Sequence, residues 1–198
     1  MYGFIRTILS LIIFISACFC IKKTKITKKK RAYIIALFVS IIICTISNFV
    51  PVENNFITFS TPAKAYKYLD FITDIKIVIE GNESALVIGE SIGSNRFFII
   101  PKADDGWKLG LGMDTQKVDT GVVKDVFYRV YQHKNTEDYF VIITNAVAES
   151  VAISDSADSE FLSFESGNGT LSYCAFIPSM DKQYRLIVDG YEIQIINE

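Results

Sequence analysis

The first 51 residues of this 198-residue chain contain no aspartate and no glutamate, although they hold eight lysines and arginines. The remaining 147 residues carry the other 12 basic residues against all 22 acidic ones, a difference of −10. This asymmetry excludes a nucleic-acid binder with a basic face, and a hydrophobic content of 50% excludes a disordered chain. We therefore expect an apolar, basic N-terminal part followed by an acidic domain, with no nucleic-acid partner.

The sequence is also poor in residues that ligate metals or act as nucleophiles. It has one histidine, His133, and only one of its four cysteines, Cys174, follows residue 51. A disulfide within the C-terminal part is therefore excluded, and no CxxC pair or Cys/His spacing typical of zinc occurs. Glycine-rich phosphate loops and paired-carboxylate motifs are missing too, so we expect no cofactor and no metal.

Two long apolar runs, Tyr2–Cys20 and Ala32–Val50, flank a short basic segment. Each run would span about 28 Å as a helix, close to the roughly 30 Å hydrocarbon core of a bilayer. We predict a two-helix transmembrane hairpin in residues 1–51, with helices at about 2–20 and 32–50 and a loop at 21–31. The chain would then be a multi-pass protein of the cell membrane.

The charge of the loop fixes the predicted orientation. Cations concentrate cytoplasmically, so residues 52–198 should lie outside, as an extracytoplasmic domain, and the loop cations should contact lipid headgroups. Arg6, near the other end of the first helix, can snorkel to the outer interface. The run Ile15-Ser16-Ala17-Cys18 also resembles a bacterial lipobox, which leaves lipidation of Cys18 open. The loop cations are Lys22, Lys23, Lys25, Lys28, Lys29, Lys30 and Arg31.

After residue 51 the pattern becomes that of a β-rich domain. Thr61 before Pro62 predicts a short helix to Leu69, because proline suits the first helical position and the threonine hydroxyl can cap it. Alternating apolar and polar residues then predict about ten strands, and Asp189-Gly190 predicts a tight hairpin. We expect a mainly-β (α+β) antiparallel sandwich or barrel-like domain, with one short helix, over residues 52–198.

Three local motifs need separate interpretation. Gly89-Glu90-Ser91-Ile92-Gly93 matches G-x-S-x-G, but a predicted strand follows it instead of a helix, which indicates a hairpin turn. Asp155, Asp158 and Glu160 could offer carboxylates to Ca²⁺, but they lack the EF-hand order, and a solvated loop is expected. Cys174 lies on a strand with apolar residues on both faces, so we expect a buried thiol.

The segment TLSYCAFIPSMDKQYRLIV resembles the signature of sortases, which are membrane-anchored cysteine transpeptidases. The resemblance implies that Cys174 is the nucleophile, His133 the acid/base and Arg185 the oxyanion-side cation. The match has departures: Tyr173 stands where the signature has threonine, and His133 lies only 41 residues before Cys174. A divergent sortase-like cysteine transpeptidase is therefore the alternative hypothesis.

A second resemblance covers about residues 56–196. The segments FSTPAKAYKYL, VIEGNESALVIGE, FFIIPKADDGWKLG and YRLIVDGYEI look like uncharacterised membrane-anchored proteins of Gram-positive Firmicutes. That resemblance implies anchor helices before one β-rich domain and brings no catalytic residues. Our first hypothesis is accordingly a non-enzymatic binding or sensing module at the bacterial cell envelope. We expect a tyrosine-rich sheet face to take a cell-envelope protein, peptide or glycan.

Overall fold

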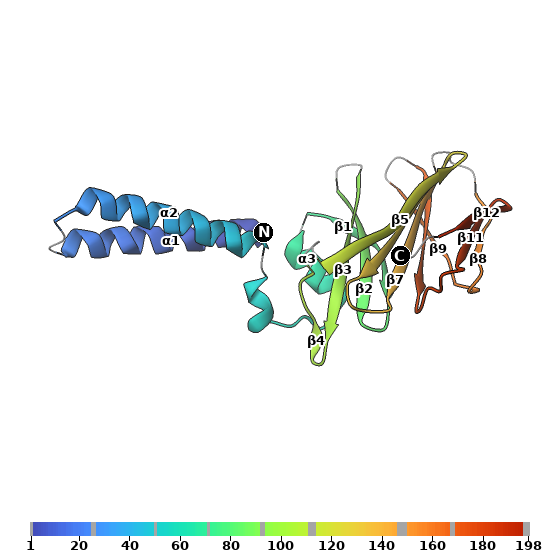
Figure 1. The fold of residues 1–198 in the computed structure, drawn as a ribbon, viewed down its shortest axis with the longest axis horizontal. Helices are drawn as coiled ribbons and strands as arrows, with labels where there is room; N and C mark the ends of the chain where they lie inside the picture. Colours follow the sequence, from blue (N-terminus) through green and yellow to red (C-terminus); the bar gives the residue numbers. More distant parts are fainter. Residues whose placement is uncertain are drawn as a thin grey trace.

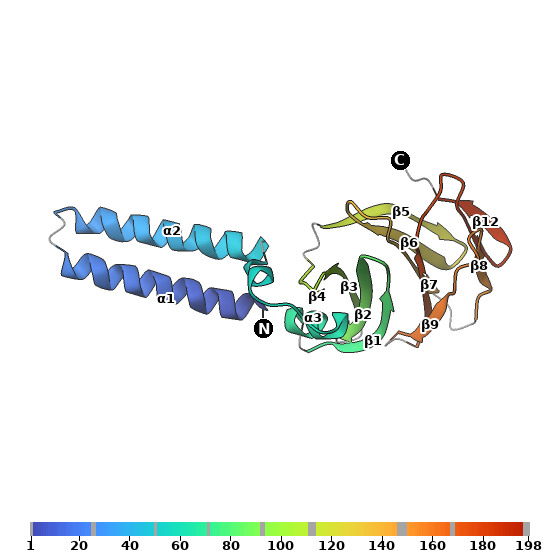
Figure 2. The same ribbon diagram turned by 90° about the horizontal axis from the view of Figure 1, so that it is seen from below.

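A helical hairpin and a β domain follow one another along the chain (Figure 1). The computed structural model describes residues 2–24, 27–49, 51–70, 72–91, 94–110, 114–145, 150–166 and 169–195. Helix α1 (Tyr2–Lys23) and helix α2 (Lys29–Phe49) lie antiparallel and side by side, and they project away from the strands (Figures 1 and 2).

Only α2 qualifies as a candidate membrane span among the described residues, over Lys29–Ser47. Helix α1 carries Arg6 near one end and two lysines at the other, so its uncharged stretch is the 15 residues Thr7–Ile21. As a helix this stretch covers about 22 Å, which is short of a hydrocarbon core of about 30 Å. The prediction of two membrane-spanning helices is therefore corrected to one candidate span, with α1 packed along it.

A polar cluster ties the hairpin to the domain. The short 3₁₀ helix η1 (Val52–Asn55) follows α2, and its Glu53 forms an ion pair with Arg6 of α1. The Arg6 side chain is 2% exposed and that of Glu53 is 14% exposed. Tyr68 also hydrogen-bonds Glu53, and burial, with the nearby Glu53 carboxylate, raises the pKa of its phenol. We expected Arg6 to snorkel to the outer membrane interface. It instead pairs with the Glu53 carboxylate of the linker.

The predicted short helix is confirmed as α3 (Pro62–Leu69). The Thr61 side chain accepts a hydrogen bond from the Lys64 backbone N–H, and Pro62 occupies the first turn. Ala65 and Tyr66 are fully buried and face the first sheet. Helix α3 therefore packs its buried face on the sheet formed by the strands that follow it in the chain.

Twelve strands form three antiparallel sheets among the described residues. The first sheet has the order β1 (Asp74–Glu80), β2 (Ser84–Ser91), β3 (Ser94–Ala103), β4 (Gly106–Trp107). The second has the order β5 (Thr115–Val123), β6 (Val126–His133), β7 (Tyr139–Asn145), β10 (Leu171–Ile177), β9 (Leu162–Glu165). The third has the order β12 (Tyr191–Gln194), β11 (Arg185–Val188), β8 (Ile153–Asp155). The expectation of a mainly-β antiparallel domain is confirmed.

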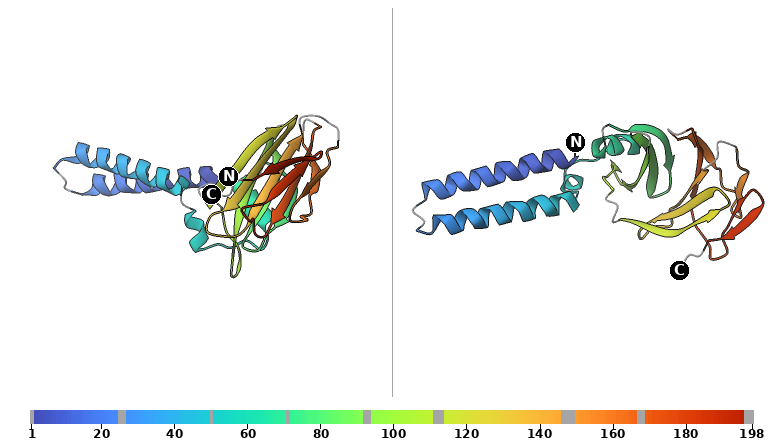
Figure 3. Two further views of the ribbon diagram at one scale, coloured as in Figure 1. Left: turned by 45° about the vertical axis from the view of Figure 1, so that its right-hand side comes forward. Right: turned by 90° about the horizontal axis from the view of Figure 1, so that it is seen from above.

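The sheets pack as layers around three apolar cores. The first and second sheets curl toward each other like an open barrel (Figures 2 and 3), with Leu86, Ile88, Phe140 and Cys174 buried between them. Helix α3 covers the other face of the first sheet. The third sheet covers the other face of the second, and Leu186 of β11 is fully buried there.

Two of the predicted turns are confirmed. The G-x-S-x-G motif lies in the β2–β3 hairpin, where Ser91 pairs with Ser94, and its Ile92 and Gly93 lie outside the described residues. Asp189 and Gly190 join β11 to β12 with φ values of 48° and 79°, which is the left-handed geometry of a tight hairpin turn.

Candidate functional site

The sequence-predicted nucleophile, Cys174, lies on the inner face of the second sheet. Its side chain is fully buried among Ile142, Phe140, Phe164 and their neighbours, as expected. Burial raises the pKa of the thiol to about 12. Because the thiolate is the reactive form, this cysteine is a poor nucleophile at neutral pH.

His133 and Arg185 lie away from that thiol. Cys174 of β10 pairs with Ile142 of the neighbouring strand β7, and Ile142 pairs with Arg129 of β6. His133 lies four residues after Arg129 on β6. That register separates His133 from Cys174 by about 13 Å along the strands and about 10 Å across them. Arg185 belongs to the third sheet, on the opposite face, where it pairs with Glu192 at 2.6 Å. The three residues are therefore not brought together.

The basic cluster lies at the end of the hairpin farthest from the strands (Figure 1). Lys22 and Lys23 end α1, Lys28 lies in the turn, and Lys29 begins α2 ahead of Lys30 and Arg31. These six side chains are exposed, and Lys29 Nζ donates to the Lys22 carbonyl at 3.2 Å. Lys25 lies outside the described residues. The cluster thus presents a dense positive charge at one end of the candidate span.

The acidic residues of two loops have structural roles that were not predicted. Asp155 is 6% exposed and accepts hydrogen bonds from Tyr184 Oη, at 2.8 Å, and from backbone N–H groups of its own turn. The solvated loop expected at this position is therefore wrong for Asp155. Asp138 is 1% exposed and accepts from Glu83 N–H and Ser84 Oγ, both at 2.8 Å. No group of three or more candidate metal ligands occurs among the described residues.

The expected tyrosine-rich binding face is not on the surface. Tyr66, Tyr128, Tyr139 and Tyr184 are buried, and only Tyr191 among the tyrosines of the β domain is more than half exposed. Burial raises the pKa of Tyr66 and Tyr128, so their hydroxyls stay protonated. Most of these tyrosines therefore pack inside the domain, and the prediction of an exposed tyrosine-rich sheet face is wrong.

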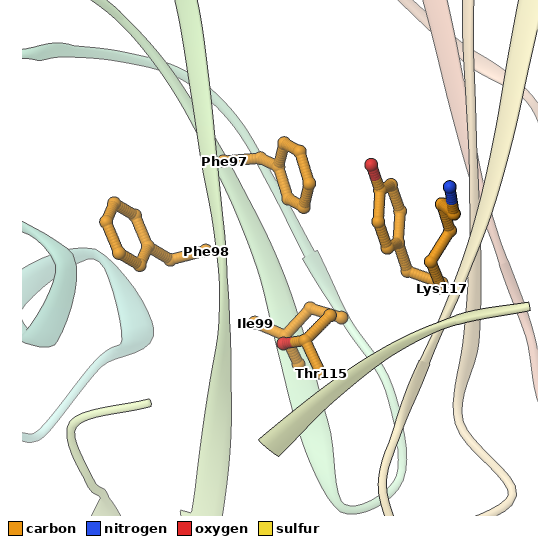
Figure 4. Close-up of a pocket in the computed structure, with 6 residues that line it drawn as sticks. Phe97, Phe98, Ile99, Thr115 and Lys117 are labelled. Atoms are coloured by element: carbon orange, nitrogen blue, oxygen red, sulfur yellow. The ribbon is translucent and has the colours of Figure 1, made fainter. Parts of the chain in front are cut away.

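A pocket that the sequence did not reveal lies at the seam between the first two sheets (Figure 4). Its cavity volume is about 250 Å³, and its lining is mostly apolar. The Phe97 and Tyr131 rings meet across the seam with centroids 4.6 Å apart. The lining residues are Phe97, Phe98, Ile99, Thr115, Lys117 and Tyr131.

The alternation of two strands places these side chains. Phe97 and Ile99 of β3 point inward, whereas Phe98 points away from them (Figure 4) and packs edge-on against Tyr66 beneath α3. Thr115 and Lys117 share one face of β5, the strand that carries the opposite wall. The only signal in the sequence is the run Phe97–Ile100, which we interpreted simply as a buried strand.

The pocket persists because β3 and β5 do not pair with each other. Each is followed along the chain by its own hairpin partner: β4 pairs with the end of β3, and β6 pairs with β5. Lys117 is exposed and forms no ion pair with the described residues. Burial raises the pKa of Tyr131, against a lowering by Arg129, so its phenol can donate a hydrogen bond. The site therefore combines an apolar hollow, the hydroxyl groups of Tyr131 and Thr115, and a cation, Lys117, without an ion pair among the described residues.

No family model matches this chain, and no curated protein or solved structure is found to be similar to it. The two family resemblances of the sequence therefore stay predictions. Interpretation of the site depends on its own geometry.

Proposed function

We propose that this chain is a membrane-anchored, non-enzymatic binding or sensing module that presents its β domain on the outer side of a bacterial cell membrane. The observation that carries the proposal is the seam pocket, an apolar hollow beside Lys117, which has no ion pair among the described residues, on a domain joined to an apolar hairpin. A cell-envelope molecule is its partner, and the bilayer holds the hairpin.

The surface of the hairpin supports the membrane anchor. Leu9 and Ile15 of α1, and Ile35 and Phe38 of α2, are each at least half exposed. Apolar helices without a protein cover are stable in lipid, where the hydrophobic effect favours their insertion. The basic loop favours a cytoplasmic position for its end, which would leave the Arg6–Glu53 junction and the β domain outside.

The seam pocket supports binding of a ligand that has an apolar group next to an acidic one. Phe97, Ile99 and Tyr131 supply apolar contact, and Lys117 supplies the charge that orients the ligand. Cys174 lies apart from both His133 and Arg185, so the positions of these residues do not support the transpeptidase alternative.

The test uses the full chain in zwitterionic lipid nanodiscs and 4-fluorophenylacetate, which carries one aromatic ring and one carboxylate. We expect ¹⁹F line broadening by the loaded nanodiscs beyond that of empty ones. Thr115→Phe fills the pocket and should abolish this broadening. Gln116→Phe places the same ring on the opposite face of β5 and should leave the broadening unchanged. Equal broadening by both variants would refute the pocket as a binding site.

A further inference from the structure

We propose that the seam binds an extended polypeptide, which adds as a strand to the free edge of β5 and inserts one apolar side chain into the pocket. This inference rests on the proposed function and names its partner class. Three observations support it. The main-chain groups of β5 point outward, the facing edge of β3 is partly occupied, and Lys117 has no ion pair among the described residues.

The main chain of β5 directs hydrogen-bonding groups away from its one partner strand, β6. The Thr120 N–H donates to the Asp119 carboxylate at 2.7 Å, so it faces outward and not toward β6. Thr120 pairs with Arg129, and across a bulge Lys117 pairs with Tyr131, two residues further along β6. Since main-chain direction alternates with a period of two, the Lys117 N–H and C=O also face outward.

Thr115 continues this outward row. It pairs with His133, whose backbone N–H donates to Asp138 on the far side of β6, at 3.1 Å. His133 therefore directs its main chain away from β5, and Thr115 directs its own outward by the same alternation. Thr115 and Lys117 thus offer main-chain donors and acceptors beside their own pocket-lining side chains. An edge of this kind is a template for strand addition.

The facing edge of β3 is already partly occupied, so it serves as the wall and not as the template. β4 pairs with Lys102 and Ala103, and the Lys108 N–H donates to the Pro101 carbonyl at 2.9 Å. Among the described residues, β5 therefore has the edge at the seam that no strand or loop segment occupies, whereas the end of the β3 edge is taken by β4 and Lys108 (Figure 2).

The pocket and the charge specify the added strand. Alternate side chains of a strand paired with β5 would point toward Phe97 and Ile99, and a cavity of about 250 Å³ suits one large apolar side chain. Ligand pockets for drug-sized molecules usually measure about 300–1,000 Å³. Lys117 favours an acidic residue at the facing position, because opposite charges stabilise cross-strand pairs.

The experiment selects peptides on the full chain. A phage library of random twelve-residue peptides is panned against the chain in zwitterionic nanodiscs, with empty nanodiscs for subtraction. We expect peptides with an aromatic or aliphatic residue and an acidic neighbour. Their binding should protect the amides of residues 114–120 from hydrogen exchange, and leave those of the α1–α2 hairpin unchanged.

Two proline variants supply the matched test. Lys117→Pro removes an outward N–H without breaking the β5–β6 ladder and should weaken peptide binding about tenfold, whereas Lys117→Gln separates out the charge. Val122→Pro makes the same change at an outward position away from the pocket, two residues beyond Thr120, and should bind like the wild type. Circular dichroism establishes that each variant is folded, and exchange protection in the wild-type chain tests the proposal without any substitution.

The outcomes separate this inference from the proposed function. Binding of 4-fluorophenylacetate without peptide selection, or peptides that protect another segment, would overturn strand addition and leave the binding module intact. Dimerisation of the chain through β5 in place of peptide binding would also overturn it. Failure of both probes would remove the proposed function as well.

Discussion

The reactivity of Cys174 separates a binding module from a cysteine transpeptidase. We expect the native thiol to react very slowly with iodoacetamide at pH 8, because it is fully buried and its pKa is raised. The measurement needs a chain in which Cys18, Cys20 and Cys44 are replaced by alanine, so that only one thiol remains.

The structure gives the expected magnitude. Burial raises the pKa of the Cys174 thiol from 9.0 to about 12, which lowers its thiolate fraction at pH 8 about a thousandfold. Alkylation of the folded chain should therefore be at least about a thousand times slower than that of the unfolded chain. Loss of access to the reagent slows it further, since no part of the side chain is exposed.

The assay follows alkylation by mass spectrometry in nanodiscs and in guanidinium. Ser163→Cys combined with Cys174→Ala provides an exposed reference thiol on the neighbouring strand, β9. The reasoning is refuted if native Cys174 reacts within about tenfold of that reference. A fast reaction that His133→Ala slows would also promote the transpeptidase alternative.

Four further predictions concern stability and topology. Asp138→Ala should lower the free energy of unfolding by about 2–4 kcal/mol, since it leaves two partly buried N–H groups and the buried Ser84 hydroxyl without their acceptor, and thermal melts against Asp138→Asn check this. Glu53→Gln should expose the linker, because it removes the carboxylate charge that pairs with the buried Arg6 guanidinium; unchanged limited proteolysis would contradict this. Stability should fall above about pH 9, because the unfolded chain loses protons that Cys174 and Tyr184 keep when folded; a melting temperature that is flat or rising from pH 8 to 10.5 would refute it. Protease added to intact cells should digest the β domain and spare a tag in the α1–α2 loop; the reverse pattern would exclude the proposed orientation.

Local chemistry made much of the fold predictable. Thr61-Pro62 specified the start of α3, Asp189-Gly190 specified a hairpin, and alternation specified antiparallel strands, because each signal depends on residues adjacent in sequence. The burial of Cys174 followed from apolar residues on both faces of its strand. The membrane span predicted for α1 was wrong, because Arg6 was expected to snorkel to the interface, whereas it pairs with Glu53 and leaves a shorter uncharged stretch.

The candidate site could not be predicted in the same way. Its walls come from β3 and β5, which belong to different sheets, and the pocket exists because these two strands stay unpaired. The sequence shows alternation in each strand but not which strand lies beside which. The separation of Cys174, His133 and Arg185 could not be predicted for the same reason, since the motif does not show that Arg185 lies on the opposite face of the second sheet.

The sequence by itself determined the apolar, basic N-terminal part, the acidic β-rich domain and several of its turns. These properties follow from composition and from interactions within a few residues. Only the tertiary structure decided that Asp138 and Asp155 are buried, that Tyr66, Tyr128, Tyr139 and Tyr184 lie in the cores, and that the β5 edge stays unpaired at the seam. Such features depend on contacts between segments that are far apart in the sequence, so they are fixed only when the sheets pack together.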